Sequence, residues 1–237
     1  MSIVLDLLLV AILGYSVYRG YKNGIIVGVI GVLVIVLAIY LANLLGNVYS
    51  GEFTGLFKPF IGGMVDDAFS VVVSDARDET TETPVVELTG SEKTDVYAVA
   101  HATVRQLGIS DPAAVKIANK VKATNDTVGQ SLSDSLSSEL SSTFAYLVIF
   151  IVGFTLIVII FLAIGNVLNL TFTLPELEKI NGGVGAAIGF FRGLVIVLLL
   201  ACVFRYLGII LTDKKISSTI LLSWLVRHNF IAGILGI

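Results

Sequence analysis

The stretch GIIVGVIGVLVIVLAIYLANLL, residues 24–45, decides the fold of this chain. It holds no charged side chain, and it exceeds the roughly 20 apolar residues that a helix needs to cross the hydrocarbon core of a bilayer. Residues 144–168 and 184–204 are mostly apolar and of similar length. Residues 3–17 form a shorter apolar stretch, interrupted only by Asp6. These four stretches are the predicted membrane spans.

The composition agrees with a membrane protein. Hydrophobic residues make up 56% of the chain and charged residues only 14%, whereas soluble domains have about 45–50% and about 25%. A cleaved signal peptide is the alternative for residues 3–17, but its basic residues would precede the apolar run. Here Arg19 and Lys22 follow it. We therefore predict an all-α membrane protein with four transmembrane helices and a helical extracytoplasmic insertion between the second and third.

The charge distribution predicts the orientation. Arg19 and Lys22 lie between the first two spans, and Lys179 lies between the last two. Short loops that carry basic residues stay in the cytoplasm, while long loops are translocated with little regard to charge. Both short turns should therefore be cytoplasmic, with these three residues as topology anchors. The insertion, residues 46–143, should face outward; it has seven basic and fourteen acidic residues.

The insertion is expected to be helical. Residues 56–73 have an apolar face broken by Gly62 and Gly63, and residues 94–107 form a second helix. Asp111 and Pro112 suit the N-cap and the first position of a third helix, which should end near Asn125.

The serine-rich run at residues 130–142 resembles a flexible linker in composition. Leu132, Leu136 and Leu140 nevertheless recur every four residues, which is typical of a helix with one apolar stripe. We predict that this segment extends the third span outward. The expected organisation is therefore residues 1–45 (spans one and two), 46–143 (insertion), 144–207 (spans three and four) and 208–237 (an interfacial amphipathic tail).

Glycines form two ridges at a spacing of four residues. Such ridges let helix backbones approach closely. The interpretation is helix packing within the monomer, with a dimer interface as the alternative. The ridge residues are Gly20, Gly24 and Gly28, and Gly185, Gly189 and Gly193.

A few polar side chains fall within the predicted spans, where charge is expensive. Arg192 either reaches the cytoplasmic interface or makes a polar contact inside the bundle. Asp6 and Arg205 belong near the outer ends of spans one and four, where the two can meet. Asn166 and Asn169 near the inner end of span three can bond across helices.

Enzymatic and metal-binding sites are not indicated. Cys202 is the only cysteine, and His101 and His228 have no further ligand at a suitable spacing. We identify no catalytic residue, metal ligand, cofactor site or nucleic-acid-binding feature.

Two motifs resemble the CvpA, or colicin V production protein, family. The first is LDL at residues 5–7 followed by YRGYKNG at residues 18–24. The second is NGGVGAAIGFFRGL at residues 181–194, a glycine ladder closed by Arg-Gly, and residues 217–224 are similar to the segment that follows it. The resemblance implies a multi-pass protein of the bacterial cytoplasmic membrane that is linked to colicin V production and export and to envelope homeostasis.

Two function hypotheses remain. The first is a membrane accessory or scaffold protein whose acidic outer loop docks a partner in envelope maintenance or toxin secretion. The second is a small oligomeric channel or transporter, with a polar lining from Asp6, Arg192 and Arg205. The lipid bilayer is a partner in both, and a homo-oligomer could enclose the pore of the second.

Overall fold

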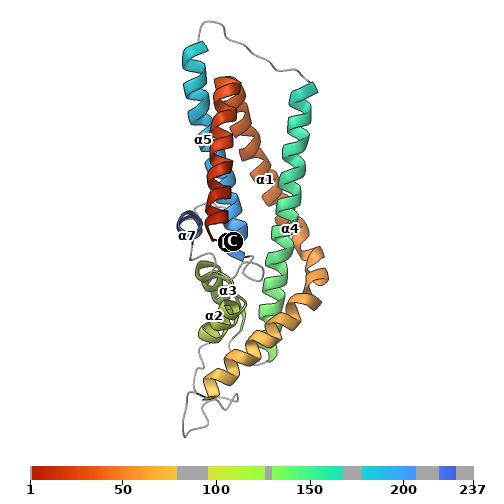
Figure 1. Ribbon diagram of the computed structural model, residues 1–237. Coiled ribbons are helices and arrows are strands. Elements are labelled where there is room, and N and C mark those ends of the chain that lie inside the picture. The colour runs from red at the N-terminus through yellow and green to blue at the C-terminus, as the bar shows by residue number, and fades with distance from the viewer. Residues whose placement is uncertain (1, 79–95, 126–129, 168–177, 207–218, 228–237) are drawn as a thin grey trace. The chain divides into compact units, whose positions relative to one another are not determined.

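A computed structural model describes residues 2–78, 96–125, 130–167, 178–206 and 219–227 (Figure 1). Within these ranges the regular elements are all helices. They are α1 (Ser2–Asp78), α2 (Val96–Gln106), α3 (Asp111–Thr124), α4 (Gln130–Val167), α5 (Glu178–Tyr206) and α7 (Leu221–Arg227).

The chain divides into two compact units. The apolar unit comprises residues 1–48, 147–203 and 215–236, and the insertion unit comprises residues 49–146 and 204–214 with residue 237. Each unit is described by itself below, for its described residues.

The helix α1 is interrupted once, at Gly24. This residue has φ 73° and ψ −176°, which is not helical. A positive φ with an extended ψ belongs to a backbone region that essentially only glycine adopts. Gly24 therefore separates two arms of α1, residues 2–23 and residues 25–48, and Figure 1 shows the change of direction where the red ribbon gives way to brown.

The first arm runs antiparallel to α5. Ser16 lies against Gly189, and Gly20, further along the arm, lies against Gly185. The partner number on α5 therefore falls as the residue number on the first arm rises.

The second arm runs parallel to α5. Gly28 lies against Ile188, and Gly31 lies against Arg192. Here both numbers rise together. Because the two arms run in opposite directions along the same helix, α1 is a helical hairpin that reverses at Gly24.

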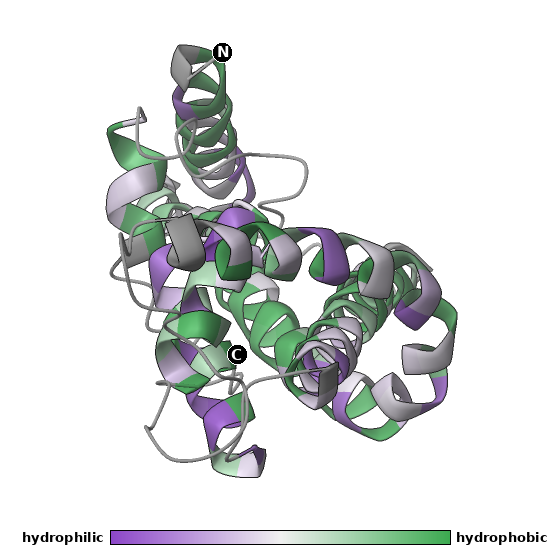
Figure 2. Ribbon diagram, turned by 90° about the horizontal axis from the view of Figure 1, so that it is seen from below, coloured by the Kyte–Doolittle hydropathy of each residue, from purple (hydrophilic) through white to green (hydrophobic). Residues whose placement is uncertain are grey.

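Among the described residues, three helices are long and apolar enough to cross a membrane: residues 4–74 of α1, residues 131–164 of α4 and residues 182–206 of α5. In Figure 2 the helix that begins at the amino terminus is coloured hydrophobic over most of its visible length. The first two predicted spans fall in the two arms of α1.

In the insertion unit, α2 and α3 pack against each other. The buried residues of the two helices include Ala100 and Val104 of α2 and Ala114, Ile117 and Val121 of α3. The predicted third helix of the insertion ends as expected, with Asn125 at its C-cap.

The serine-rich segment is helical, as its leucine spacing predicted. It forms the beginning of α4, and Leu132, Leu136 and Leu140 are all buried. The intervening Ser133, Ser137 and Ser141 are buried as well. The Ser141 hydroxyl donates to the Ser137 carbonyl oxygen one turn back, at 2.6 Å, which satisfies a polar group inside the packed face.

Gly62 and Gly63 lie within α1, where Ile61, Val65 and Ala68 are buried at helical spacing. One local prediction was wrong. The N-cap of α3 is Ser110, not Asp111; Ser110 has the extended backbone of a cap residue, and Asp111 is already in the first helical turn.

Candidate functional site

The two glycine ridges meet each other within one chain. A Cβ added to Gly20 would clash with the carbonyl oxygen of Gly185 and would lie 2.8 Å from the Cα of Gly189. A Cβ added to Gly185 would lie 3.0 Å from the Cα of Gly24. Cβ contacts this short with backbone atoms leave no room for a side chain, so the close approach of α1 and α5 depends on glycine.

The ends of the ridges face side chains. A Cβ on Gly28 would lie 3.1 Å from the Ile188 side chain, and one on Gly193 would lie 2.8 Å from the Cβ of Ser16. The first arm of α1 therefore follows the groove along α5 over the whole ridge.

A cavity of about 380 Å³ lies beside this contact, between the first arm, the start of the second arm and α5. Its volume falls in the range of small-molecule sites, about 300–1,000 Å³. Its lining residues are Leu8, Ala11, Ile12, Tyr15, Ser16, Arg19, Gly20, Asn23, Val27, Gly28, Gly189, Arg192 and Ile196.

Two arginines face this cavity, one from each helix. The charge of Arg19 acts on Arg192, so the two guanidinium groups repel each other. The described residues that line the cavity include no carboxylate. The missing side chain of Gly31 makes room for Arg192, because a Cβ there would lie 2.9 Å from Nη1 of Arg192.

From the sequence, Arg19 was predicted only as a topology anchor, and Ser16 and Asn23 were not predicted as site residues. Tyr15, Arg19 and Asn23 recur every four residues, and Ser16 lies three residues before Arg19. These four residues therefore share one face of the first arm. This periodicity could have been recognised in the sequence. The face of α5 that lies opposite could not be predicted, because it depends on the reversal at Gly24.

Asp6 binds the backbone of the carboxyl-terminal segment. Its Oδ2 accepts a hydrogen bond from the Ile220 amide at 2.9 Å, and its Oδ1 accepts one from the Leu222 amide at 3.2 Å. The Thr219 hydroxyl accepts a third from the Ser223 amide at 3.1 Å. The first amides of a helix have no partner within that helix, so Asp6 and Thr219 together cap α7.

Replacing this carboxylate should loosen the carboxyl-terminal segment. Asp6→Ala removes the acceptor of two amides, and losing a helix cap typically costs about 0.5–2 kcal/mol. We expect a lower melting temperature in detergent and faster proteolysis after Lys215, compared with the wild type. Asp134→Ala, at an exposed carboxylate of α4, is the control and should leave both unchanged. Equal proteolysis of the two variants would contradict the capping role.

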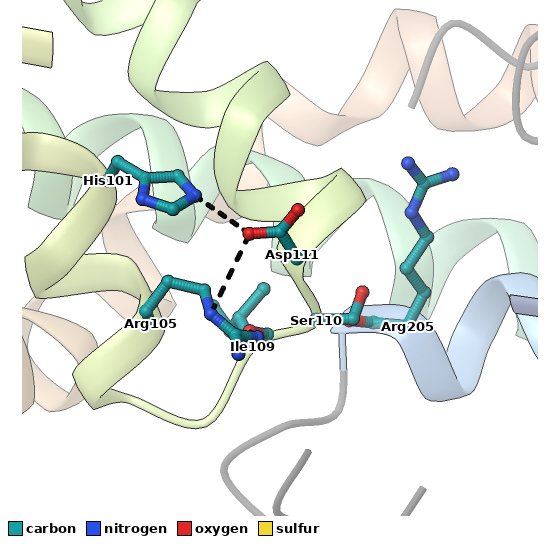
Figure 3. A network of polar contacts seen from close by, with 6 residues as sticks. All are labelled: His101, Arg105, Ile109, Ser110, Asp111 and Arg205. Carbon is teal, nitrogen blue, oxygen red and sulfur yellow. Dashed lines mark hydrogen bonds and ion pairs between the residues drawn. The ribbon is translucent and has the colours of Figure 1, made fainter. Parts of the chain in front are cut away.

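Arg205 belongs to the insertion unit and is buried. Its carbonyl oxygen accepts hydrogen bonds from the Ser110 amide at 3.2 Å and from the Ser110 hydroxyl at 3.0 Å. Its Nε has no hydrogen-bond partner among the residues that the structure describes. The main chain of Arg205 thus fixes the start of α3, as Figure 3 shows.

A neighbouring polar network connects α2 to α3 (Figure 3). Asp111 lies 3.1 Å from the His101 ring nitrogen Nε2 and 3.9 Å from the Arg105 Nε. The Arg105 Nη1 also donates to the Ile109 carbonyl oxygen at 2.8 Å. Asp111 is largely exposed, so these ion pairs contribute little to stability. Their effect is to orient the turn between the two helices.

The structure does not describe the side chains of three further predicted site residues. Asn169 lies outside the described residues, and the side chains of Asn166 and Lys179 lie outside the described part of their helices. Among the described residues, no group of three His, Cys, Asp or Glu is arranged to hold a metal ion.

Comparison with known proteins gives a family match over one part of the chain. Residues 118–229 match the family model described as Colicin V production protein. No curated protein and no solved structure matches the chain. The matched range includes the glycine motif of α5 and the segment of α7, and it excludes the amino-terminal motif that also suggested the family. The resemblance seen in the sequence is therefore confirmed at residues 118–229, the part of this membrane protein that matches the Colicin V production protein family model.

Proposed function

We propose that this chain crosses the bacterial cytoplasmic membrane four times and serves as an accessory or scaffold protein in toxin production or secretion and in envelope homeostasis. The proposal assigns it no catalytic activity and no cofactor. Its role is to hold the insertion unit at the outer face of the membrane, where that unit binds a partner protein.

The four crossings are supported by the hairpin of α1. The two arms run in opposite directions beside α5, as two successive membrane spans would. Arg19 and Lys22 lie next to the reversal at Gly24, and basic residues in a short turn favour the cytoplasmic side. The insertion then begins on the opposite side of the membrane.

The observation that carries the proposal is the separate packing of the insertion unit. The helices α2 and α3 and the beginning of α4 bury their own apolar faces, so this unit has a core of its own. Several of its carboxylates are exposed, and they include Glu52, Asp66, Asp67, Asp111 and Asp134. A folded acidic surface of this kind suits a partner with a basic surface, because complementary charge favours association.

A channel or transporter is the second candidate, and the cavity with Arg19 and Arg192 favours it. Of the polar lining predicted for such a pore, Arg192 faces the cavity, while Asp6 is not among its described lining residues. An oligomer in which these cavities join would be needed for a conducting path.

The test separates the two candidates. In a deletion strain that produces a colicin V-type toxin, we expect wild-type protein to restore toxin in the medium. A variant with residues 96–124 replaced by a Gly-Ser linker should not restore it, although it reaches the membrane at the same level. Restoration by this variant would contradict the scaffold role.

The channel candidate is tested in purified proteoliposomes. We expect no ion flux above that of empty vesicles, because a scaffold needs no open path. Flux through the wild type that is lost in Arg192→Gln would favour the channel candidate instead.

A further inference from the structure

We propose that the cavity between α1 and α5 is a binding site for an anionic phospholipid, with the phosphate at Arg19 and Arg192 and an acyl chain along its apolar wall. This inference concerns a ligand site in the apolar unit and does not depend on the proposed scaffold function.

The cavity has a polar end and an apolar end. On the first arm its polar lining residues are Tyr15, Ser16, Arg19 and Asn23, whereas Leu8, Ala11 and Ile12 come before them. With a rise of 1.5 Å per residue, the segment from Leu8 to Asn23 covers about 22 Å along the helix axis. The polar groups therefore gather towards the hairpin, and the apolar ones lie further from it.

The lining residues of α5 are arranged in the same way, with the charged residue nearer the hairpin. Because α5 runs antiparallel to the first arm, Ile196 lies further from the hairpin than Arg192 does. A ligand that fits both walls must have a charged group near the hairpin and an apolar part beyond it. This is the chemistry of an amphiphile.

The charge of the polar end selects an anion. Two guanidinium groups repel each other in an environment of low dielectric constant, and a bound anion would relieve that repulsion. Guanidinium groups bind phosphate oxygens through two parallel N–H donors. The hydroxyl groups of Tyr15 and Ser16 and the Asn23 amide line the same end and provide further donors.

The surroundings indicate that this anion comes from the bilayer. Tyr15 lines the polar end of the cavity, and Tyr18 and Tyr21 follow it on the same arm towards the hairpin. These three tyrosines have 61%, 63% and 62% of their surfaces exposed. Exposed tyrosines on a membrane helix favour the headgroup region. Leu8, at the other end, is 46% exposed, so the apolar wall is accessible to acyl chains. A phospholipid in the cytoplasmic leaflet would meet both ends at suitable depths.

The test uses the full chain purified in a neutral detergent and transferred to mixed micelles of phosphatidylglycerol and phosphatidylcholine in equal amounts. Native mass spectrometry counts the lipids that remain bound. We expect the wild type to retain phosphatidylglycerol in preference to phosphatidylcholine. Arg19→Gln and Arg192→Gln should each weaken this binding about tenfold or more, because a hydrogen bond to a charged group is lost.

The matched control is Lys22→Gln, which removes an exposed positive charge three residues from Arg19 but outside the cavity lining. It should retain phosphatidylglycerol as the wild type does. Equal retention of the two lipids by the wild type would overturn the proposal, as would an equal loss in Lys22→Gln and Arg192→Gln. Displacement of phosphatidylglycerol by inorganic phosphate alone would assign the site to a soluble phosphate and overturn the lipid assignment.

A second measurement needs no variant and so does not depend on their folding. Phosphatidylglycerol with a photoreactive acyl chain is added to the wild type in the same micelles. We expect adducts at Leu8, Ala11 or Ile196, and we expect excess unlabelled phosphatidylglycerol to suppress them. Adducts spread over α4 at the same yield would contradict a defined site.

Discussion

Gly189→Leu is expected to destabilise the protein strongly. A Cβ at this position would clash with the backbone oxygen of Ser16 and would lie 3.0 Å from the Cα of Gly20. Both neighbours are backbone atoms, so no side chain can rotate away, and the helices must move apart. Overpacking a close contact costs about 1–3 kcal/mol. We expect Gly189→Ala to be destabilising as well, because the first carbon of the side chain already makes the clash.

Gly183→Leu is the matched control on the same helix. A Cβ at Gly183 meets nothing within 4 Å. Replacing a helical glycine generally favours the helix, by up to about 1 kcal/mol. Thermal unfolding in detergent should therefore rank Gly183→Leu at or above the wild type and Gly189→Leu clearly below it. Equal melting temperatures for the two variants would show that the ridges are not in contact.

The periodic features of the sequence predicted most of the helices. The spacing of Leu132, Leu136 and Leu140 identified a helix within a serine-rich segment, and the structure buries all three. The signal is local, because a helix that buries one face repeats its apolar residues every three to four positions. The glycine spacing is local in the same sense, and it marked the smooth faces of α1 and α5.

Contacts between distant segments could not be predicted from the sequence. Asp6 was expected to share its depth with Arg205, but the hydrogen bonds described for its carboxylate are to the amides of Ile220 and Leu222. Nothing in the residues around Asp6 identifies that partner, which is more than two hundred positions away. The cavity is similar, because the repulsion between Arg19 and Arg192 arises only once the hairpin sets the first arm beside α5.

The local role of a glycine was also not predictable from the sequence. Glycine weakens a helix, yet Gly62 and Gly63 lie within α1, where the neighbouring Ile61 and Val65 are buried. Gly24, in contrast, belongs to a regularly spaced ridge and is nevertheless the point at which α1 reverses. Glycine spacing alone does not distinguish a ridge residue from a turn residue, since both uses require the missing side chain.

The proposed topology has four crossings, with the reversal at Gly24 on the cytoplasmic side. The most direct test is labelling of single cysteines in intact cells with a membrane-impermeant thiol reagent. Cys202 is buried in α5, and Cys202→Ala removes it as a background. One variant then carries Ser91→Cys in the insertion, and the other carries Asn23→Cys next to the reversal.

We expect an all-or-none difference between these two variants. Ser91→Cys should be labelled in intact cells, because the proposed topology puts the insertion outside. Asn23→Cys should be labelled only after the cells are permeabilised, because the proposed topology puts the short basic turn in the cytoplasm. Labelling of Asn23→Cys in intact cells, with Ser91→Cys protected until permeabilisation, would contradict the orientation; labelling of both in intact cells would contradict the reversal between two spans.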